Sequence, residues 1–278
     1  MEACGGHGAT WLPLPSASNW RRLAWRHRVL FSLLLPPSLR RAATVLTLSA
    51  QARDEIQRFD PGLRAPVRVG PAAPKQIFRP LDADTAAAVL ARHDLRRPFL
   101  LAVGSLQPRK NLTRLVEAFD QVRRRHPDIH LVIVGPSGFR ASALRDAMAN
   151  AGLADAVRLL GYVSEDELMA LYNAAVALVY PSVYEGFGLP VVEAMACGRP
   201  VIAANASSLP EVAGTAALLV DPFDVSAQGS AMERLLADPQ AAADLGTRGL
   251  ARVAQFSWQR TASTALAASE AACGASTP

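Results

Sequence analysis

Residues 176–204 read VALVYPSVYEGFGLPVVEAMACGRPVIAA, in which a polar, glycine-containing loop and a helix-like segment separate two apolar runs. The runs at 176–180 and 201–204 are continuous rather than alternating, which predicts strands buried on both faces. Pro190 and Gly198 stand where the first position of a helix and the residue after its end are expected. A buried strand, a helix and a second buried strand predict a parallel sheet with helices on both faces.

The same order of elements extends over most of the chain. Further continuous apolar runs lie at 99–103, 130–134, 157–160 and 217–220, and helical segments follow at 223–237, 240–255 and 258–270. Ser164 and Glu167 form a capping box for a helix that runs to Asn173. The sequence therefore predicts an α/β fold with a doubly wound, Rossmann-like parallel sheet, whose ligand lies at the carboxyl ends of the strands.

The front of the chain differs from this domain. Residues 1–19 show no periodicity and are predicted to be unstructured or foreign to the fold. Residues 20–80 contain strands, a helix capped by Ser49 and a proline-rich linker, and we expect a partial second domain there. The predicted division is 1–19, 20–80 and 81–278, with the ligand-binding domain last.

Basic side chains are concentrated at the front. Residues 1–80 hold 12 basic and 4 acidic side chains, against 17 and 20 in 81–278. The segment 20–35 joins a basic stretch to an apolar one, and helical spacing places an apolar face opposite arginines. It is too short to cross a bilayer and lacks the cleavage site of a signal peptide. We expect this helix to dock on protein, with peripheral contact to an anionic membrane surface as the alternative.

Composition excludes several classes of protein. Hydrophobic residues make up 50% of the chain and the net charge is +5, which indicates a soluble protein with a sizeable core rather than a disordered, collagenous or coiled-coil chain. Three scattered cysteines form neither a disulfide framework nor a zinc site, which favours a reducing, cytoplasmic compartment. The chain has no Walker, dinucleotide-binding or serine-nucleophile motif.

Three loops after predicted strands carry polar residues and should face one crevice: 104–111, 135–138 and 182–188. In the first, Arg109 and Lys110 precede a helix, where backbone N–H groups and the helix dipole favour an anion. A forked guanidinium beside an ammonium suits a diphosphate, although both could be solvated surface charges. The second loop either borders a nucleotide or forms a turn.

Two carboxylates, Glu185 and Glu193, stand eight positions apart across the third loop and the helix after it. Gly186 and Gly188 allow the backbone to approach a ligand. The carboxylates can accept hydrogen bonds from sugar hydroxyls, and the amides of Gly188 and Leu189 can donate to phosphate. For Glu193 alone, a first-turn glutamate favoured by the helix dipole is the alternative.

Other patterns are weaker. Tyr162 and Val163 follow a strand and either border a flat base or pack in the core. Asp82 and Asp84 match a metal-binding Asp-x-Asp pattern, but their position before a helix favours capping. The five histidines are not spaced as ligands, and no metal site is predicted.

These residues resemble a known family, the nucleotide-sugar-dependent retaining glycosyltransferases of the group 1, or family 4, type. Their glycosyltransferase-B fold has two Rossmann-like domains, and the resemblance covers about residues 98–270 as the C-terminal, donor-binding domain. The matching segments are 104–105, 109–111, 161–163, 181–182, 185–190, 193–200 and 209–212. Some of them resemble bacterial mannosyl- or rhamnosyltransferases of surface polysaccharide synthesis.

The resemblance implies a role for each matching residue. Arg109 and Lys110 would bind the donor diphosphate without a metal ion or other cofactor. Glu185 would contact the transferring sugar as the catalytic residue, Glu193 the ribose, and 162–163 the base. The implied donor-binding residues are Gly104, Arg109, Lys110, Tyr162, Val163, Glu185, Gly186, Phe187, Gly188, Leu189 and Glu193.

The implied activity is transfer of a hexose, with retention, from a nucleoside-diphosphate sugar such as GDP-mannose to a glycan or lipid-linked acceptor. Such a transfer belongs to surface polysaccharide or glycoconjugate synthesis and involves no nucleic acid. Residues 20–80 resemble only the last part of the family's N-terminal domain, so an N-terminally truncated enzyme is expected. The alternative is a noncatalytic nucleotide-sugar-binding remnant. A phosphorylase is disfavoured because neither Lys75 nor Lys110 stands in a pyridoxal phosphate site.

Overall fold

The computed structural model describes residues 25–136 and 141–274, which separate into two packed units. The described part of the first unit comprises residues 25–72 and 256–274. Residues 73–255 make up the second unit.

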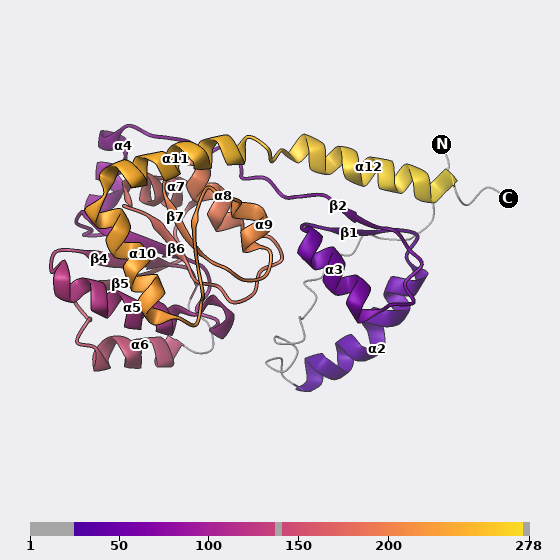
Figure 1. Ribbon diagram of the computed structural model, residues 1–278, viewed down its shortest axis with the longest axis horizontal. Helices are drawn as coiled ribbons and strands as arrows, with labels where there is room; N and C mark the ends of the chain where they lie inside the picture. Colours follow the sequence, from indigo (N-terminus) through magenta and orange to yellow (C-terminus); the bar gives the residue numbers. More distant parts are fainter. Residues whose placement is uncertain (1–24, 137–140, 275–278) are drawn as a thin grey trace. The chain divides into compact units, whose positions relative to one another are not determined.

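A six-stranded parallel sheet forms the centre of the second unit, in the order β5-β4-β3-β6-β7-β8 (Figure 1). The strands are β3 (Phe99–Val103), β4 (His130–Val134), β5 (Val157–Gly161), β6 (Leu178–Tyr180), β7 (Val201–Ala204) and β8 (Leu218–Val220). Every predicted apolar run forms a strand, although β6 begins two residues later than expected. The chain builds outward from β3 to β5 and then returns to β6, so β3 and β6 flank the switch point where ligands bind in such sheets.

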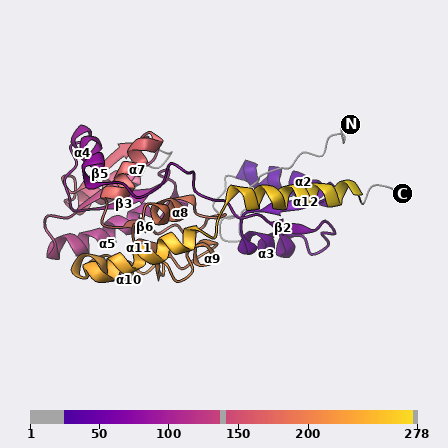
Figure 2. The same ribbon diagram turned by 90° about the horizontal axis from the view of Figure 1, so that it is seen from above.

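Helices cover both faces of this sheet. Figure 2 shows α4 and α7 on one side and α5 and α10 on the other. The helical elements of the unit are α4 (Ala83–Arg92), the short 3₁₀ turn η1 (Pro108–Lys110), α5 (Leu112–Arg125), α6 (Ala141–Asn150), α7 (Glu165–Ala174), α8 (Leu189–Ala196), α9 (Leu209–Ala213), α10 (Val225–Ala237) and α11 (Pro239–Val253). The predicted doubly wound fold is therefore confirmed.

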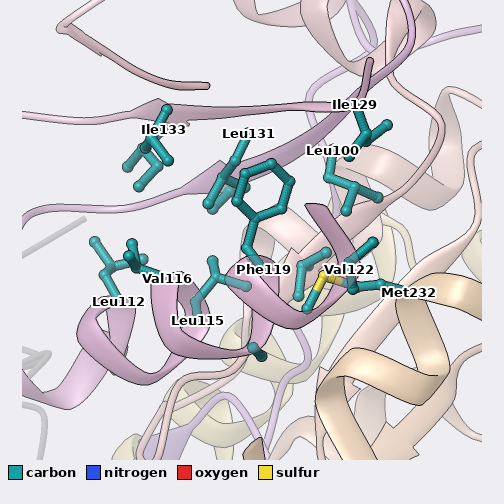
Figure 3. Close-up of a cluster of buried hydrophobic side chains, with 14 of the residues drawn as sticks. Leu100, Leu112, Leu115, Val116, Phe119, Val122, Ile129, Leu131, Ile133 and Met232 are labelled. Carbon is teal, nitrogen blue, oxygen red and sulfur yellow. The ribbon is translucent and has the colours of Figure 1, made fainter. Parts of the chain in front are cut away.

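The apolar face of α5 anchors the core of this unit (Figure 3). Leu112, Leu115 and Phe119 recur at helical spacing and point toward strand residues that include Leu131 and Ile133. Leu115 and Phe119 have no exposed surface. Burial of each such side chain contributes roughly 1.5–3 kcal/mol, so this face fixes α5, and with it the loop that precedes α5.

The described part of the first unit contains the parallel pair β1 (Val45–Thr47) and β2 (Val67–Val69) with three helices. They are α2 (Trp25–Arg41), α3 (Ala50–Phe59) and α12 (Trp258–Gly274). Ser49 caps α3 as predicted, because its hydroxyl accepts a hydrogen bond from the amide of Ala52.

The basic helix predicted at 20–35 is described only in part. Residues 20–24 and the side chains of 25–32 lie outside the described residues, so its predicted amphipathic face is not tested. Farther along α2, Leu35 and Leu39 pack against Ile56 of α3, while Leu33 and Leu34 are exposed. No helix in the described ranges is both long enough and apolar enough to cross a membrane.

The last helix packs with the first unit rather than with the sheet that precedes it in the sequence. In α12 the Thr261 hydroxyl donates a hydrogen bond to the carbonyl of Pro71. A Cβ on Gly70 would lie 3.5 Å from the Thr261 methyl group, so the helix packs directly on the end of β2. Packing thus divides the chain at residues 72 and 255, whereas the functional boundary near residue 80 stays a prediction.

Candidate functional site

The loops after β3 and β6 meet at the carboxyl end of the sheet, at its switch point. The Val183 amide donates a hydrogen bond to the Arg109 carbonyl at 2.8 Å, and the Ser182 hydroxyl oxygen lies 3.1 Å from the same carbonyl oxygen. Because β3 and β6 are neighbouring strands, the sheet brings together segments about 75 positions apart in the sequence. The structure therefore places Arg109 and Lys110 beside the third polar loop, at the edge of the sheet where the sequence predicts a ligand.

Glu185 lies at the centre of this meeting point and is 9% exposed. Its Oε1 accepts hydrogen bonds from Lys110 Nζ at 2.6 Å and Arg109 Nη1 at 2.8 Å. The Ser182 and Tyr180 hydroxyls donate to the same oxygen at 2.6 and 2.9 Å. Oε2 makes no hydrogen bond within the described part of the chain. One carboxylate oxygen is therefore held by the protein, and the other is left to accept from a ligand.

The charged groups of this cluster shift one another's pKa values. Burial acts to raise the pKa of Glu185, but the positive charges of Lys110 and Arg109 outweigh it, so the pKa lies below its usual value. For Lys110, burial lowers the pKa, and Arg109 lowers it further against the opposing effect of Glu185. The alternative of two solvated surface cations is excluded for Lys110, which is 7% exposed. Arg109, whose side chain is 31% exposed, lies on the solvent side of the cluster.

Two glycines make this arrangement possible. Gly104 has a φ of +147°, and a Cβ there would lie 2.9 Å from Cε of Lys110. Gly188 has a φ of +107° at the start of α8, and a Cβ there would lie 2.6 Å from Leu209 Cδ2. By contrast, Gly186 adjoins open space, as expected of backbone that a ligand can approach. Because the conformation at residue 188 requires glycine, Gly188 fixes the end of the loop that carries Glu185.

Glu193 is the fifth residue of α8, and the first turn of that helix contains no acidic residue. The first-turn alternative for Glu193 is therefore wrong. The Tyr172 hydroxyl donates to Glu193 Oε2 at 2.9 Å. Burial raises the pKa of the Glu193 carboxyl and outweighs the opposing hydrogen bond from Tyr172; Glu165 raises it further and Lys75 lowers it. The structure gives no hydrogen bond between Glu193 and Glu185, so the two carboxylates stand as separate contact points.

The remaining predicted residues have mixed surroundings. Tyr162 is 82% exposed, whereas Val163 is buried. The burial of Val163 agrees with core packing, one of the two alternatives that the sequence leaves open. Phe187 is buried, and Leu189 at the start of α8 is exposed. Of the loop at 135–138, residues 137 and 138 lie outside the described residues. A role for Tyr162 and Val163 beside a base stays a prediction.

Sequence reasoning missed several residues that hold the loop in place. Tyr180 and Ser182 bind the carboxylate of Glu185, and Ser207 and Ser208 donate to its backbone carbonyl at 2.7 and 3.0 Å. Their position was a usable signal, because each follows or ends a central strand on the edge where ligands bind.

The described residues contain no group of three or more His, Cys, Asp or Glu side chains that could hold a metal ion. Asp82 occupies the N-cap position of α4, but its side chain makes no capping hydrogen bond. The pattern at 82–84 thus spans the N-cap and the first two residues of a helix, and Asp82 does not make the cap contact that the sequence suggests.

A doubly wound domain with two cations beside a buried carboxylate at its switch point can bind a ligand that carries phosphate. The chain belongs to the family of group 1 glycosyl transferases, which it matches over residues 90–252. This confirms the family resemblance, and the chain corresponds mostly to the C-terminal half of the glycosyltransferase-B fold.

Curated relatives include O-antigen chain mannosyltransferase B of Escherichia coli, which is 35% identical over 230 residues. That match covers 81% of this chain and 60% of the relative. The match therefore spans about 60% of the length of that relative.

Among solved structures, sucrose-phosphate synthase from Thermosynechococcus elongatus has a TM-score of 0.76 and 30% identity. The match covers 92% of this chain and 64% of the synthase. The Anabaena protein HepE, solved with UDP and glucose, has a TM-score of 0.78 over 92% of this chain and 70% of that chain. At 20% identity, HepE shows the shared fold alone.

Proposed function

We propose that this chain is the donor-binding part of a retaining hexosyltransferase that uses a nucleoside-diphosphate sugar. The acceptor in this proposal is a glycan or lipid-linked oligosaccharide of cell-surface synthesis, reached from the cytoplasmic side. The observation that carries the proposal is Glu185, held through Oε1 between Lys110 and Arg109 with Oε2 left for a ligand.

The two cations are the proposed diphosphate contacts. When the bond between the sugar and the nucleoside diphosphate breaks, its electron pair stays on the phosphate oxygen, and negative charge grows there. Arg109 and Lys110, already fixed beside Glu185, stabilise that charge without reorganising, and the amides of Gly188 and Leu189 add donors at the start of α8. Two fixed cations supply the countercharge that a divalent ion supplies elsewhere, so transfer is expected to persist in EDTA.

The two carboxylates are the proposed sugar contacts. Oε2 of Glu185 accepts from a hydroxyl of the transferring sugar, and Glu193 accepts from the ribose hydroxyls. Tyr162, exposed beyond the end of β5, borders the base together with the backbone at Val163. Support for mannose comes from the Escherichia coli relative, named an O-antigen chain mannosyltransferase, so GDP-mannose is the proposed donor. Because HepE was solved in complex with UDP and glucose, UDP-glucose is the donor against which GDP-mannose is compared.

The test is a transfer assay on the full chain with GDP-mannose and UDP-glucose, mannosylated and lipid-linked acceptors, and EDTA as one arm. Glu185→Gln should lower turnover ten- to a hundredfold, because a hydrogen bond to a charged group contributes about 1.5–3 kcal/mol. Binding of the nucleoside diphosphate should stay nearly intact. Glu117→Gln, an exposed glutamate of α5, is the matched control.

Equal turnover by Glu185→Gln and the unchanged chain would remove Glu185 from the reaction. Donor binding without transfer to any acceptor would favour the noncatalytic alternative. Loss of turnover in EDTA would show that Arg109 and Lys110 do not replace a divalent ion in the reaction.

A further inference from the structure

Tyr172 is a fully buried tyrosine whose hydroxyl points at a proposed ligand contact. It lies on α7 and is 1% exposed, and its hydroxyl donates to Glu193 Oε2 at 2.9 Å. Its ring packs edge-on against Phe78, with ring centres 5.8 Å apart and planes at 79°. Oε1 of Glu193 makes no hydrogen bond in residues 25–136 or 141–274. The buried phenol therefore holds one carboxylate oxygen and leaves the other unengaged.

This contact restricts a flexible side chain. A glutamate has three rotatable bonds, and binding a ligand to it normally costs the freedom that the carboxylate loses. Burial raises the pKa of the Tyr172 phenol well above its ordinary value, and the negative charge of Glu193 raises it further, so the group remains a donor. Lys75, the nearest lysine, is paired with Glu165. Tyr172 is thus the one described side chain that hydrogen-bonds to the Glu193 carboxylate.

We propose that Tyr172 is a positioning residue that makes the site select ribose, by fixing Glu193 Oε2 and directing Oε1 to the 2′ and 3′ hydroxyls of the nucleotide. This inference rests on the proposed function, in which Glu193 binds the ribose. Selection follows from preorganisation, since a fixed acceptor gains most from a ligand that offers both hydroxyls.

The experiment compares ribose with deoxyribose ligands. Calorimetry on the full chain measures GDP, UDP and their 2′-deoxy and 3′-deoxy forms. In Tyr172→Phe, which keeps the ring against Phe78, the preference for the ribose forms should fall about tenfold. Affinity for the deoxy forms should change less than affinity for the ribose forms, because each deoxy form offers Glu193 only one of the two hydroxyls.

Two control variants separate this role from a general loss of structure. Tyr180→Phe removes the matching phenol that binds Glu185, and the ribose preference should not change. Phe78→Leu weakens the packing of Tyr172 without removing its hydroxyl, so it should lower the unfolding midpoint and leave the preference intact. Each variant is measured at a temperature at which circular dichroism shows it folded.

The outcomes distinguish this inference from the function on which it rests. An unchanged preference in Tyr172→Phe, together with a lost preference in Glu193→Ala, would overturn the role of Tyr172 alone. An unchanged preference in both would overturn the ribose contact itself. If neither diphosphate binds the unchanged chain, the proposed function fails and the inference with it.

Discussion

At the residue scale, Glu185 and Glu193 have opposite electrostatic surroundings. Cations hold the pKa of Glu185 below its usual value, whereas burial holds the pKa of Glu193 above it. Glu185 therefore keeps its charge to a lower pH in the folded state than in the unfolded chain, and this charge favours the folded state. The ionised form of Glu193 opposes folding, because its position is partly buried and no cation is bound to it in the described residues.

We predict that Glu193→Gln stabilises the protein at pH 7 while weakening nucleotide binding. The raised folded pKa means that folding binds a proton, so Glu193 contributes less to stability as pH rises through its folded pKa. Glutamine removes the charge and still accepts from Tyr172. Urea unfolding at pH 7 and near pH 4 measures the effect: the gain in midpoint should be present at pH 7 and shrink at pH 4. A midpoint that falls equally at both values would contradict the prediction.

The sequence indicated the charged residues of the site but not how they are held. Glu185, Glu193, Arg109 and Lys110 were predicted because a carboxylate pair and a cation pair follow strand ends. Which oxygen of Glu185 is bound, and by which hydroxyls, depends on how the loop after β6 folds over the loop after β3. That contact joins residues that no local pattern links.

At the element scale, α7 begins with a capping box. The Ser164 hydroxyl accepts from the Glu167 amide at 3.2 Å, and the Glu167 carboxylate accepts from the Ser164 amide at 3.0 Å. Hydrogen bonds from the backbone and hydroxyl of Ser164 lower the pKa of Glu167 to about 2, and Arg92 and His93 assist. This cap fixes the start of the helix that presents Tyr172.

Ser164→Ala should lower the free energy of unfolding by about 1 kcal/mol at pH 7. The lowered pKa of Glu167 makes part of this contribution depend on pH: it is present above about pH 4.5 and lost as pH falls toward about 2. The difference between the two chains, measured by urea unfolding, should therefore narrow in acid. Ser226→Ala, an exposed first-turn serine of α10 outside the N-cap, should have little effect. A loss in Ser226→Ala as large as in Ser164→Ala would show that the cap has no special role.

Strands and helices that follow from short sequence patterns were predictable, but the unit with which each one packs was not. The strands and the caps at Ser49 and Ser164 follow from apolar runs and single polar residues, which act over a few positions. The helix at 258–274 has an equally clear local pattern. Its packing on Gly70 through Thr261 joins residues about 190 positions apart, so the sequence assigned it to the domain that precedes it.

At the scale of the whole molecule, the second unit contains every proposed contact to the nucleotide sugar. The sheet order places the switch point between β3 and β6, and the loops there bring two cations against Glu185. The central claim is therefore that this cluster of cations beside Glu185 recognises a diphosphate. Two charge-assisted contacts of about 1.5 kcal/mol each correspond to about a hundredfold in affinity.

The most direct measurement is calorimetry of GDP and UDP against guanosine and uridine on the full chain. Replacing both cations, Arg109→Ala with Lys110→Ala, should weaken the diphosphate about a hundredfold and leave the nucleoside unchanged. Arg109→Ala alone, which leaves the buried pair of Lys110 and Glu185 in place, should weaken diphosphate binding about tenfold. Arg124→Ala, at the far end of α5, should leave the affinity for the diphosphate unchanged. Small, equal losses for the diphosphate and the nucleoside would contradict the account.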